Sequence, residues 1–333
     1  MTNEVTASLS VRLASPERKH IVSKERNTNT MQKSPARRVS TAFKNAARLF
    51  TGIAVLMAAA TSQAQTNQKP TIVLVHGAFN DSSSWEGVIR ELPNGYRVIA
   101  AANPLRGVKS DSSYLANLID SIKGPVVLVG HSISGMMITN AATGKSNVKA
   151  LVYVAALAPD AGETADDLLS KFPGGTPGSA WLGPPVDLGG GAHDLYVQQE
   201  KFHAQFAADV PASKARIMAV TQRPIVDTTF KEQSGPPAWK SIPSWFIYGT
   251  GDKNLPVATT AFMAKRAGAR KVVEIKGASH LLMVSHPKET AKLVVAAAQH
   301  TAAAQHTAAA QQPAAAQQPA AQPPESGTGS SGQ

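Results

Sequence analysis

The segment Gly124-Pro125-Val126-Val127-Leu128-Val129-Gly130-His131-Ser132-Ile133-Ser134-Gly135 decides the fold of this chain of 333 residues. Its apolar, β-branched run Val126–Val129 predicts a buried strand, and the apolar residues that follow recur at helical spacing. Ser132 stands at the sharp turn between them, and a strand, a turn with a central serine and a helix form a nucleophile elbow. Such a turn lifts the serine hydroxyl above the sheet and points the free N–H groups of the helix at the atom that the serine attacks.

The elbow departs from the usual pattern at one position. The pattern is G-x-S-x-G, but the fifth position here is Ser134, and Gly135 comes one place later. Serine is small enough for strand and helix to approach closely, so we expect Ser132 to be a nucleophile. The alternative interpretation is an ordinary strand–turn–helix junction that contains a serine.

Apolar strand patterns alternate with helical patterns on both sides of the elbow. The predicted strands are 71–75, 96–101, 126–129, 148–155, 244–248 and 271–275, and the predicted helices are 85–92, 114–122, 136–141, 257–267 and 287–298. Strands and helices that alternate in short βαβ units favour a parallel sheet with helices on both faces. We therefore expect a three-layer α/β fold with a mostly parallel sheet of about six strands.

The alternation breaks between about residues 159 and 237. Glycine- and proline-rich stretches in this region are loop material. Helical patterns lie at 165–172, 195–206 and 212–220. We interpret 159–237 as a helical lid inserted into one folded body, residues 66–298, rather than as a second domain.

The first 65 residues resemble an export signal. Residues 1–65 hold ten Lys and Arg against three Asp and Glu, with a basic region at 37–48 and an apolar core at 49–60. The small residues of Ser62-Gln63-Ala64 predict cleavage after Ala64, hence a periplasmic or secreted protein without stable membrane association. An uncleaved anchor and a start at Met31 are the alternatives.

The rest of the composition narrows the function. Most of the formal net charge of +11 comes from the leader, and the body has no basic run with interleaved aromatic residues, so we expect no nucleic-acid partner. The chain has no cysteine, which excludes disulfides and thiolate chemistry. Residues 299–333 are an Ala/Gln/Pro-rich repeat that predicts a disordered tail, although its alanines can extend the last helix until the prolines that begin at Pro313 stop it.

An acid and a base follow two later strands. Asp252 follows the strand at 244–248, and His280 follows the strand at 271–275. Because the carboxyl ends of parallel strands lie along one edge of a sheet, both side chains can meet Ser132 there. The nucleophile, the acid and the base of such a triad then follow in the chain order Ser, Asp, His. Asp252 as a helix cap and His280 as an ordinary loop histidine are the alternatives, and His286 is the rival base.

Catalysis by such a triad also needs two N–H donors for the oxyanion. Ile133, directly after the nucleophile, offers one backbone N–H. The second is expected from the loop after the first strand, with Phe79 as first choice and Ala78 as second. The candidate apolar walls of a substrate pocket are Ala78, Phe79, Trp181, Phe202 and Met283, and core packing is the alternative for each.

The other histidines have weaker patterns. His76 and His131 flank the predicted active edge, where we expect them to pack or to orient loops, and His193 and His203 lie in the predicted lid. No group of residues has the spacing of metal ligands. We therefore expect no metal site.

Taken together, these pieces resemble the α/β-hydrolase superfamily. The resemblance rests on His76–Phe79 with Trp85, Gly130–Gly135, Tyr248–Asp252 and Gly277–His280, which together span about residues 70–298. It is strongest to the small esterase branch that includes plant methyl-ester esterases, hydroxynitrile lyases and bacterial relatives. The resemblance implies ester cleavage through an acyl-enzyme, no cofactor, a lid that shapes the pocket, and triad roles for Ser132, Asp252 and His280.

The expected function is that of a serine carboxylesterase acting on a small-molecule ester. One alternative is a carbon–carbon lyase on the same scaffold, which would recruit a cation from the lid, Lys240 or Lys231. The other is a binding protein that keeps the triad without using it.

Overall fold

A six-stranded parallel sheet forms the centre of the fold. The computed structural model describes residues 69–176 and 178–310. Every neighbouring pair in the sheet is parallel. The spatial order is β2 (Val98–Ala101), β1 (Thr71–Val75), β3 (Val126–His131), β4 (Val148–Val154), β8 (Ser244–Gly249) and β9 (Lys271–Ile275). The predicted fold class and number of strands are confirmed.

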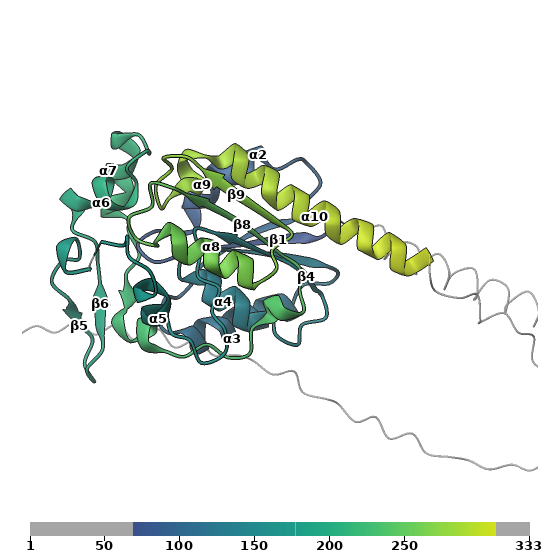
Figure 1. Cartoon of the computed structure of the whole chain (residues 1–333), viewed down its shortest axis with the longest axis horizontal. Helices are drawn as coiled ribbons and strands as arrows, with labels where there is room; N and C mark the ends of the chain where they lie inside the picture. The colour runs from purple at the N-terminus through teal and green to yellow at the C-terminus, as the bar shows by residue number, and fades with distance from the viewer. Residues whose placement is uncertain (1–68, 177, 311–333) are drawn as a thin grey trace, which may run out of the picture. The chain divides into compact units, whose positions relative to one another are not determined.

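Helices cover both faces of this sheet. Their bounds are α2 (Glu86–Glu91), which follows the short 3₁₀ helix η1 (Ser82–Trp85), α3 (Val108–Asp120), α4 (Ser134–Ala141), α8 (Val257–Arg266), α9 (Leu282–Ser285) and α10 (Pro287–Ala310). Figure 1 shows α2, α9 and α10 above the sheet and α3 and α4 below it. The fold is therefore a three-layer α/β sandwich.

The central strands are buried on both faces. Every residue of β1 and β3 is buried, and Ile72, Val73 and Leu128 are fully inaccessible to solvent. This burial explains why β1 and the apolar part of β3 are continuous rather than alternating apolar runs. Packing on both faces fixes the positions of the strand ends, and so of the loops that follow the strands at the carboxyl edge of the sheet.

The segment between β4 and β8 contains helices and a small antiparallel sheet. Its elements are α5 (Ala165–Ser170), η2 (Gly178–Ala180), β5 (Val186–Asp187), β6 (His193–Leu195), α6 (Gln199–Phe206), α7 (Ala212–Val220), β7 (Ile225–Val226), η3 (Asp227–Lys231) and η4 (Ala238–Lys240). The prediction of a helix starting at Leu195 is wrong, because Leu195 pairs with Ile225 across the antiparallel sheet. This pairing between residues distant in sequence overrides the local helical pattern.

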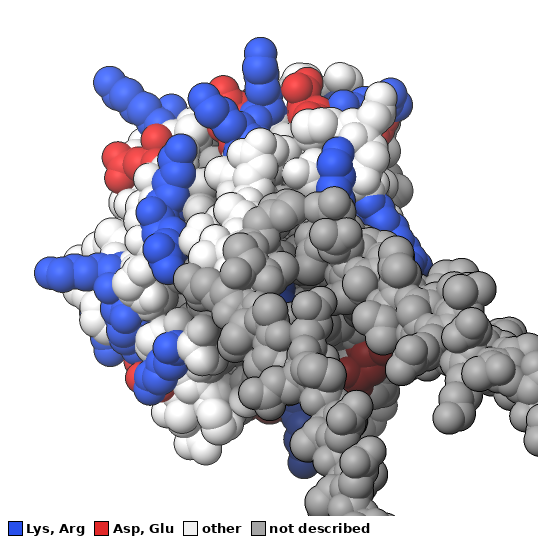
Figure 2. All heavy atoms as spheres, turned by 90° about the vertical axis from the view of Figure 1, so that its right-hand side faces the viewer, with Lys and Arg blue, Asp and Glu red and all other residues white. Residues whose placement is uncertain are grey.

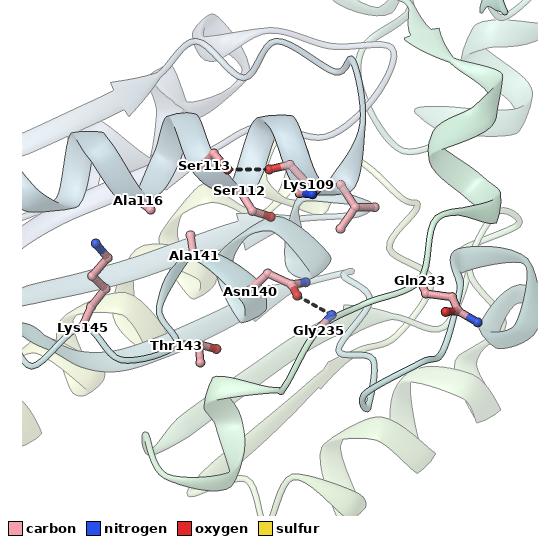
Figure 3. Close-up of a pocket in the computed structure, with 11 residues that line it drawn as sticks. Lys109, Ser112, Ser113, Ala116, Asn140, Ala141, Thr143, Lys145, Gln233 and Gly235 are labelled. Atoms are coloured by element: carbon pink, nitrogen blue, oxygen red, sulfur yellow. Dashed lines mark hydrogen bonds between the residues drawn. The ribbon is translucent and has the colours of Figure 1, made fainter.

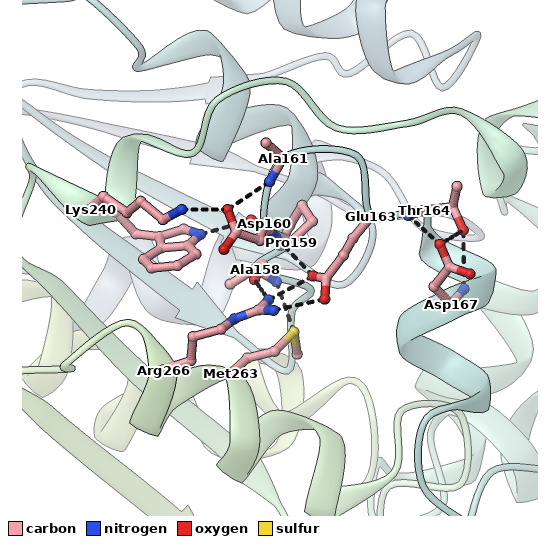
Figure 4. Close-up of polar contacts among 11 residues, drawn as sticks. Ala158, Pro159, Asp160, Ala161, Glu163, Thr164, Asp167, Lys240, Met263 and Arg266 are labelled. Carbon is pink, nitrogen blue, oxygen red and sulfur yellow. Dashed lines mark hydrogen bonds and ion pairs between the residues drawn. The ribbon is translucent and has the colours of Figure 1, made fainter.

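Ion pairs fasten the start of this inserted segment to the rest of the fold (Figure 4). Arg266 of α8 holds Glu163 with two contacts, Nη1 to Oε1 at 2.7 Å and Nη2 to Oε2 at 2.8 Å. Its Nη2 also donates to the carbonyl oxygen of Ala158 at 2.8 Å. Burial alone would raise the pKa of Glu163, but the hydrogen bonds from Arg266 and from the N–H of Asp160 outweigh it and keep that pKa below its usual value. Glu163 is therefore a charged anchor.

The last helix extends into the alanine-rich repeat, as its alanines allow. Helix α10 continues past residue 298 to Ala310 (Figure 1), so residues 299–310 are helical. Alanine has the highest helix propensity, and the first proline of the repeat is Pro313. Thr301 is also buried, and its Oγ1 donates to the carbonyl oxygen of Ala297 at 3.0 Å.

Two further observations concern the surface. Figure 2 shows, on the visible part of one face, Lys and Arg side chains separated by uncharged residues and in places by Asp or Glu. Within residues 69–176 and 178–310, no helix is long and apolar enough to cross a membrane. The predicted export signal and residues 311–333 lie outside the described part of the chain.

Replacing Gly135 by alanine should destabilise the fold. A Cβ at this position would lie 2.0 Å from the carbonyl oxygen of Leu157, so the backbone of α4 or of the loop after β4 must move. We expect the free energy of unfolding, measured by urea denaturation, to fall by about 1–3 kcal/mol. Gly183→Ala is the control, because the atom nearest to its Cβ would be the Tyr196 carbonyl oxygen at 3.7 Å. Equal stability of the two variants would contradict the prediction.

Candidate active site

Ser132 occupies a strained turn between β3 and α4. Its φ angle is 57°, in the left-handed region that costs a non-glycine residue about 1–3 kcal/mol. Backbone hydrogen bonds hold it there: the Ser132 N–H donates to the Val154 carbonyl at 3.2 Å, and the Ser132 carbonyl accepts the N–H groups of Gly135 and Leu157, both at 3.0 Å. The structure thus has the predicted elbow geometry.

The three predicted triad residues meet at the carboxyl edge of the sheet. His280 Nε2 lies 2.8 Å from Ser132 Oγ, and His280 Nδ1 lies 2.6 Å from Asp252 Oδ2. The side chains of His280 and Asp252 are only 3% and 2% exposed, whereas Ser132 is half-buried. A continuous hydrogen-bonded chain therefore runs from the buried carboxylate to the serine hydroxyl.

Asp252 is fixed by its own loop. Its second oxygen, Oδ1, accepts the backbone N–H groups of Asn254 at 2.8 Å and Leu255 at 3.0 Å. The carboxylate thus closes the turn between β8 and α8 with one oxygen and orients His280 with the other. Helix α8 itself is capped by Pro256 without a side-chain hydrogen bond, so Asp252 is not its N-cap.

His131 packs beneath the base. Its ring centroid lies 4.9 Å from that of His280, and its Nε2 lies 3.1 Å from the His280 carbonyl oxygen, to which it can only donate. Burial, followed by the neighbouring His280, keeps the pKa of His131 well below its ordinary value. Among the described residues its Nδ1 has no hydrogen-bond partner, as expected for a neutral ring. His131 thus holds the loop that carries the base, in line with its predicted orienting role.

The rival base, His286, lies outside this chain of hydrogen bonds. Its Nε2 is 3.3 Å from Asp209 Oδ2, and its Nδ1 is 3.9 Å from Glu289 Oε2.

Among the described residues no three His, Asp or Glu side chains gather as a metal site requires.

The first choice for the second oxyanion donor is wrong. The N–H of Phe79 donates to the carbonyl oxygen of Arg223 at 2.9 Å, so it already has an acceptor in the inserted segment. Ala78, the second choice, lines the same cavity as Ser132 and Ile133. Phe79 instead contributes its ring to the cavity wall and adopts a left-handed φ of 61°.

The cavity above Ser132 is narrow and apolar. It has a volume of about 70 Å³. Its lining residues are Ala78, Phe79, Ser132, Ile133, Leu157, Leu169, Trp181, Phe206, Phe230, Asn254, Leu255 and His280. The rings of Phe79 and Trp181 meet edge to face at 5.8 Å, and Phe206 meets His280 edge to face at 4.8 Å. The triad therefore opens into an aromatic pocket.

Two of the predicted pocket residues are core residues. Phe202 is fully buried and packs behind Phe206 at a ring distance of 5.6 Å, and Met283 is fully buried in α9. The sequence did not identify Phe206 and Phe230 as wall residues. Helical spacing puts Phe202 and Phe206 on one buried face of α6, but it does not tell which of the two reaches the cavity. Leu255 had a usable signal, since it directly follows the turn of Asp252.

A wider groove continues from the cavity. It has a volume of about 700 Å³ and shares Phe79, Leu169, Trp181, Phe230 and Asn254 with the inner cavity. Charged residues, Asp166, Asp227 and Lys231, line it away from the triad. A ligand therefore has an apolar inner part and a more polar outer part to occupy.

A separate cavity lies between α3 and α4 (Figure 3). It has a volume of about 370 Å³, and its lining includes Lys109, Ser112, Asn140 and Lys145 but no triad residue. Asn140 Oδ1 accepts the N–H of Gly235 at 2.7 Å, which closes one side of the cavity.

Comparison with known proteins identifies the family of this chain. Residues 72–293 match the sequence profile of the Alpha/beta hydrolase family. Alpha-hydroxynitrile lyase of Arabidopsis thaliana is 25% identical over 244 residues, which cover 67% of this chain and 94% of that protein. Salicylic acid-binding protein 2 of Nicotiana tabacum is 26% identical over 247 residues, which cover 65% and 92%, respectively.

Solved structures share the fold at lower identity. Polyneuridine aldehyde esterase has a TM-score of 0.58 at 20% identity, with 69% of this chain and 99% of that chain covered. A pyrethroid hydrolase from Sphingobium faniae has a TM-score of 0.55 at 23% identity, with 69% and 97% covered.

A parallel sheet with an elbow serine after β3, an aspartate after β8 and a histidine after β9 defines the class of α/β hydrolases. The profile match spans well over half of the chain. This chain belongs to the alpha/beta hydrolase family, and the resemblance seen in its motifs is confirmed.

The two buried histidines should make the fold sensitive to mild acid. Burial lowers the pKa of both His131 and His76 in the folded protein, whereas the unfolded chain titrates near the ordinary value of 6.5. The unfolded state therefore binds more protons below that pH, so stability is fully present above about pH 6.5 and is lost as pH falls, by about 1.4 kcal/mol per pH unit and histidine.

Urea unfolding at pH 7.5, 6.0 and 5.0 measures this loss. His131→Asn and His76→Asn should each be less stable at pH 7.5 but show a shallower dependence on pH than the wild type. A pH slope that neither substitution changes would contradict the assignment.

Proposed function

We propose that this protein hydrolyses carboxylic esters through an acyl-enzyme formed at Ser132. The observation that carries the proposal is the hydrogen-bonded chain from Asp252 through His280 to Ser132, with links of 2.6 Å and 2.8 Å. A serine hydroxyl is a weak nucleophile until a neighbouring base takes its proton. His280 is such a base, because its Nε2 lies within hydrogen-bond distance of Ser132 Oγ.

Acylation begins when Ser132 Oγ attacks the ester carbonyl carbon and His280 Nε2 takes the hydroxyl proton. Asp252 keeps His280 in the tautomer that leaves Nε2 free to accept, and stabilises the imidazolium that forms. The backbone N–H groups of Ala78 and Ile133 would bind the developing oxyanion, a contribution worth about 3 kcal/mol per donor. The leaving alcohol takes the proton from His280 as the carbon–oxygen bond breaks.

Deacylation repeats these steps with water. His280 takes a proton from water, the hydroxide attacks the acyl carbon, and Ser132 leaves with the proton returned by His280. One ester and one water give one carboxylic acid and one alcohol, and no cofactor takes part in the balance.

The cavity favours a small, uncharged molecule around the reacting carbonyl. Trp181, Phe206 and Leu255 line it, and its polar lining residues are Ser132, His280 and Asn254. A charged group of the ligand would lose its hydration shell in this cavity and find no oppositely charged side chain to replace it, which costs several kcal/mol. The membership in a hydrolase family and the similarity to plant esterases support the same substrate class.

A lyase activity is the second candidate, because one relative is named alpha-hydroxynitrile lyase. The positions of the two candidate cations speak against it. Lys240 Nζ is 2.6 Å from Asp160 Oδ1, and its side chain is 56% exposed. Lys231 lines the outer groove, and the described lining of the inner cavity contains no Lys or Arg.

Replacing Ser132 by alanine should abolish ester hydrolysis. We expect the rate on p-nitrophenyl acetate and butyrate to fall by at least about a thousandfold, and a fluorophosphonate probe to label the wild type at Ser132 but not the variant. Thr139→Val serves as a control for folding. Retained hydrolysis by Ser132→Ala, or cyanide release from a cyanohydrin by a wild type that spares esters, would overturn the proposal.

We also propose that the chain is exported, on the basis of the leader at residues 1–65 alone. Expressed in a Gram-negative host, the mature protein should begin at Gln65 and appear in the periplasmic or extracellular fraction. Amino-terminal sequencing of the purified protein measures this. A mature chain that retains residues 49–60 would contradict cleavage and favour an anchor.

A further inference from the structure

The serine that breaks the elbow pattern has a fully satisfied, buried hydroxyl. Ser134 is 0% exposed. Its Oγ donates to the carbonyl oxygen of His76 at the end of β1 and accepts from Asn103 Nδ2 at 2.8 Å. A glycine at this position would offer neither contact.

Asn103 and His76 complete a closed network. Asn103 Nδ2 also reaches the carbonyl oxygen of His76 at 3.3 Å, and the N–H of Asn103 donates to His76 Nε2 at 3.1 Å. His76 Nδ1 donates to the carbonyl oxygen of Gly77 at 2.9 Å. His76 is thus a neutral ring with its proton on Nδ1, and burial lowers its pKa accordingly. Ser134 Oγ thus holds the peptide between His76 and Gly77 directly, and the His76 ring holds the next peptide, between Gly77 and Ala78.

The fixed peptides lie against the nucleophile. A Cβ at Gly77 would lie 2.7 Å from Ser132 Cβ and 2.8 Å from the His131 carbonyl oxygen. This close contact leaves no room for a side chain at position 77. The rotation of the peptide between Gly77 and Ala78 is held by the hydrogen bond from His76 Nδ1 to the Gly77 carbonyl oxygen, and His76 is in turn held by Ser134 and Asn103.

Two glycines meet the requirement for close packing at the elbow. A Cβ at Gly135 would lie 2.0 Å from the Leu157 carbonyl oxygen, and one at Gly130 would lie 2.9 Å from the Ser134 carbonyl oxygen. Gly130 thus allows strand β3 to approach helix α4, and Gly135 allows α4 to approach the loop after β4. Position 134 has room for a hydroxymethyl group, and the chain uses it for a polar contact.

We propose that Ser134 is a positioning residue that ties the elbow to the end of β1 and so sets the Ala78 N–H relative to the Ile133 N–H. Its importance for rate rests on the proposed function. If both N–H groups bind the oxyanion, a shift of one peptide weakens the transition state more than the bound substrate. Loss of the network therefore lowers kcat and leaves KM nearly unchanged.

The test compares Ser134→Ala and Ser134→Gly with Thr139→Val. Thr139 is a matched control, because it is buried in the same helix and its Oγ1 contacts Tyr153 OH at 2.8 Å and the Gly135 carbonyl oxygen at 2.6 Å rather than the loop after β1. On p-nitrophenyl acetate we expect both Ser134 variants to lose about tenfold to a hundredfold in kcat, with KM within about twofold. The inhibition constant of a trifluoromethyl ketone, whose adduct places an oxyanion in the same hole, should rise by the same factor.

A second measurement does not depend on turnover. Backbone ¹⁵N relaxation should show the order parameters of Gly77 and Ala78 falling from the rigid value of about 0.85 in both Ser134 variants and not in Thr139→Val. If Ser134→Ala does not fold, Ser134→Gly decides, since glycine is the usual residue of the pattern.

The outcomes are separable. Wild-type kcat, inhibitor binding and order parameters in both Ser134 variants would overturn the positioning role, as would an equal loss in Thr139→Val. A wild type that neither hydrolyses esters nor reacts with the fluorophosphonate would overturn the proposed function, and the relaxation data would then still decide whether Ser134 fixes this loop.

Discussion

The site depends on one close contact of backbone with backbone, where the end of β1 lies against the turn at Ser132. Gly77 has no room for a Cβ there. Ser132 keeps its unfavourable left-handed φ of 57° because its backbone is hydrogen-bonded to the peptides of Val154, Gly135 and Leu157. Strain of this kind persists only where the surroundings fix it. Strands β1 and β3, buried throughout, and β4, of which only Lys149 is exposed, provide those surroundings, so the sheet is the source of the geometry at the serine.

The parallel sheet then brings the acid and the base to the same place without further design. Strands β8 and β9 are neighbours, and the loops after them carry Asp252 and His280 to the edge where β3 ends. Each loop is also held from the side: Asn254 and Leu255 bind Asp252, and His131 binds the His280 carbonyl. The result is a buried carboxylate and imidazole whose orientation is fixed before any ligand binds, which is the form that electrostatic catalysis needs.

These relations explain what could be predicted from the sequence. The strands β1 and β9 occur at the predicted residues, and the triad meets as expected, because apolar runs and strand ends are local signals that a parallel sheet converts into positions. The cavity wall was only partly predictable. Phe206 and Phe230 belong to a segment whose small sheet pairs residues far apart in sequence, and Phe202, with the same apolar character, faces the core instead. Apolar character alone does not tell a wall residue from a core residue.

Phe79, which was predicted as an oxyanion donor, instead links the inserted segment to the loop after β1, a contact that the sequence motifs do not indicate. The N–H of Phe79 donates to the Arg223 carbonyl at 2.9 Å, while its ring contacts Trp181 in the cavity wall. One residue of the β1 loop is thus bound to the inserted segment through both its backbone and its side chain. The inserted segment that shapes the cavity therefore also holds the loop that carries Ala78. A displacement of the inserted segment would move this loop through Phe79.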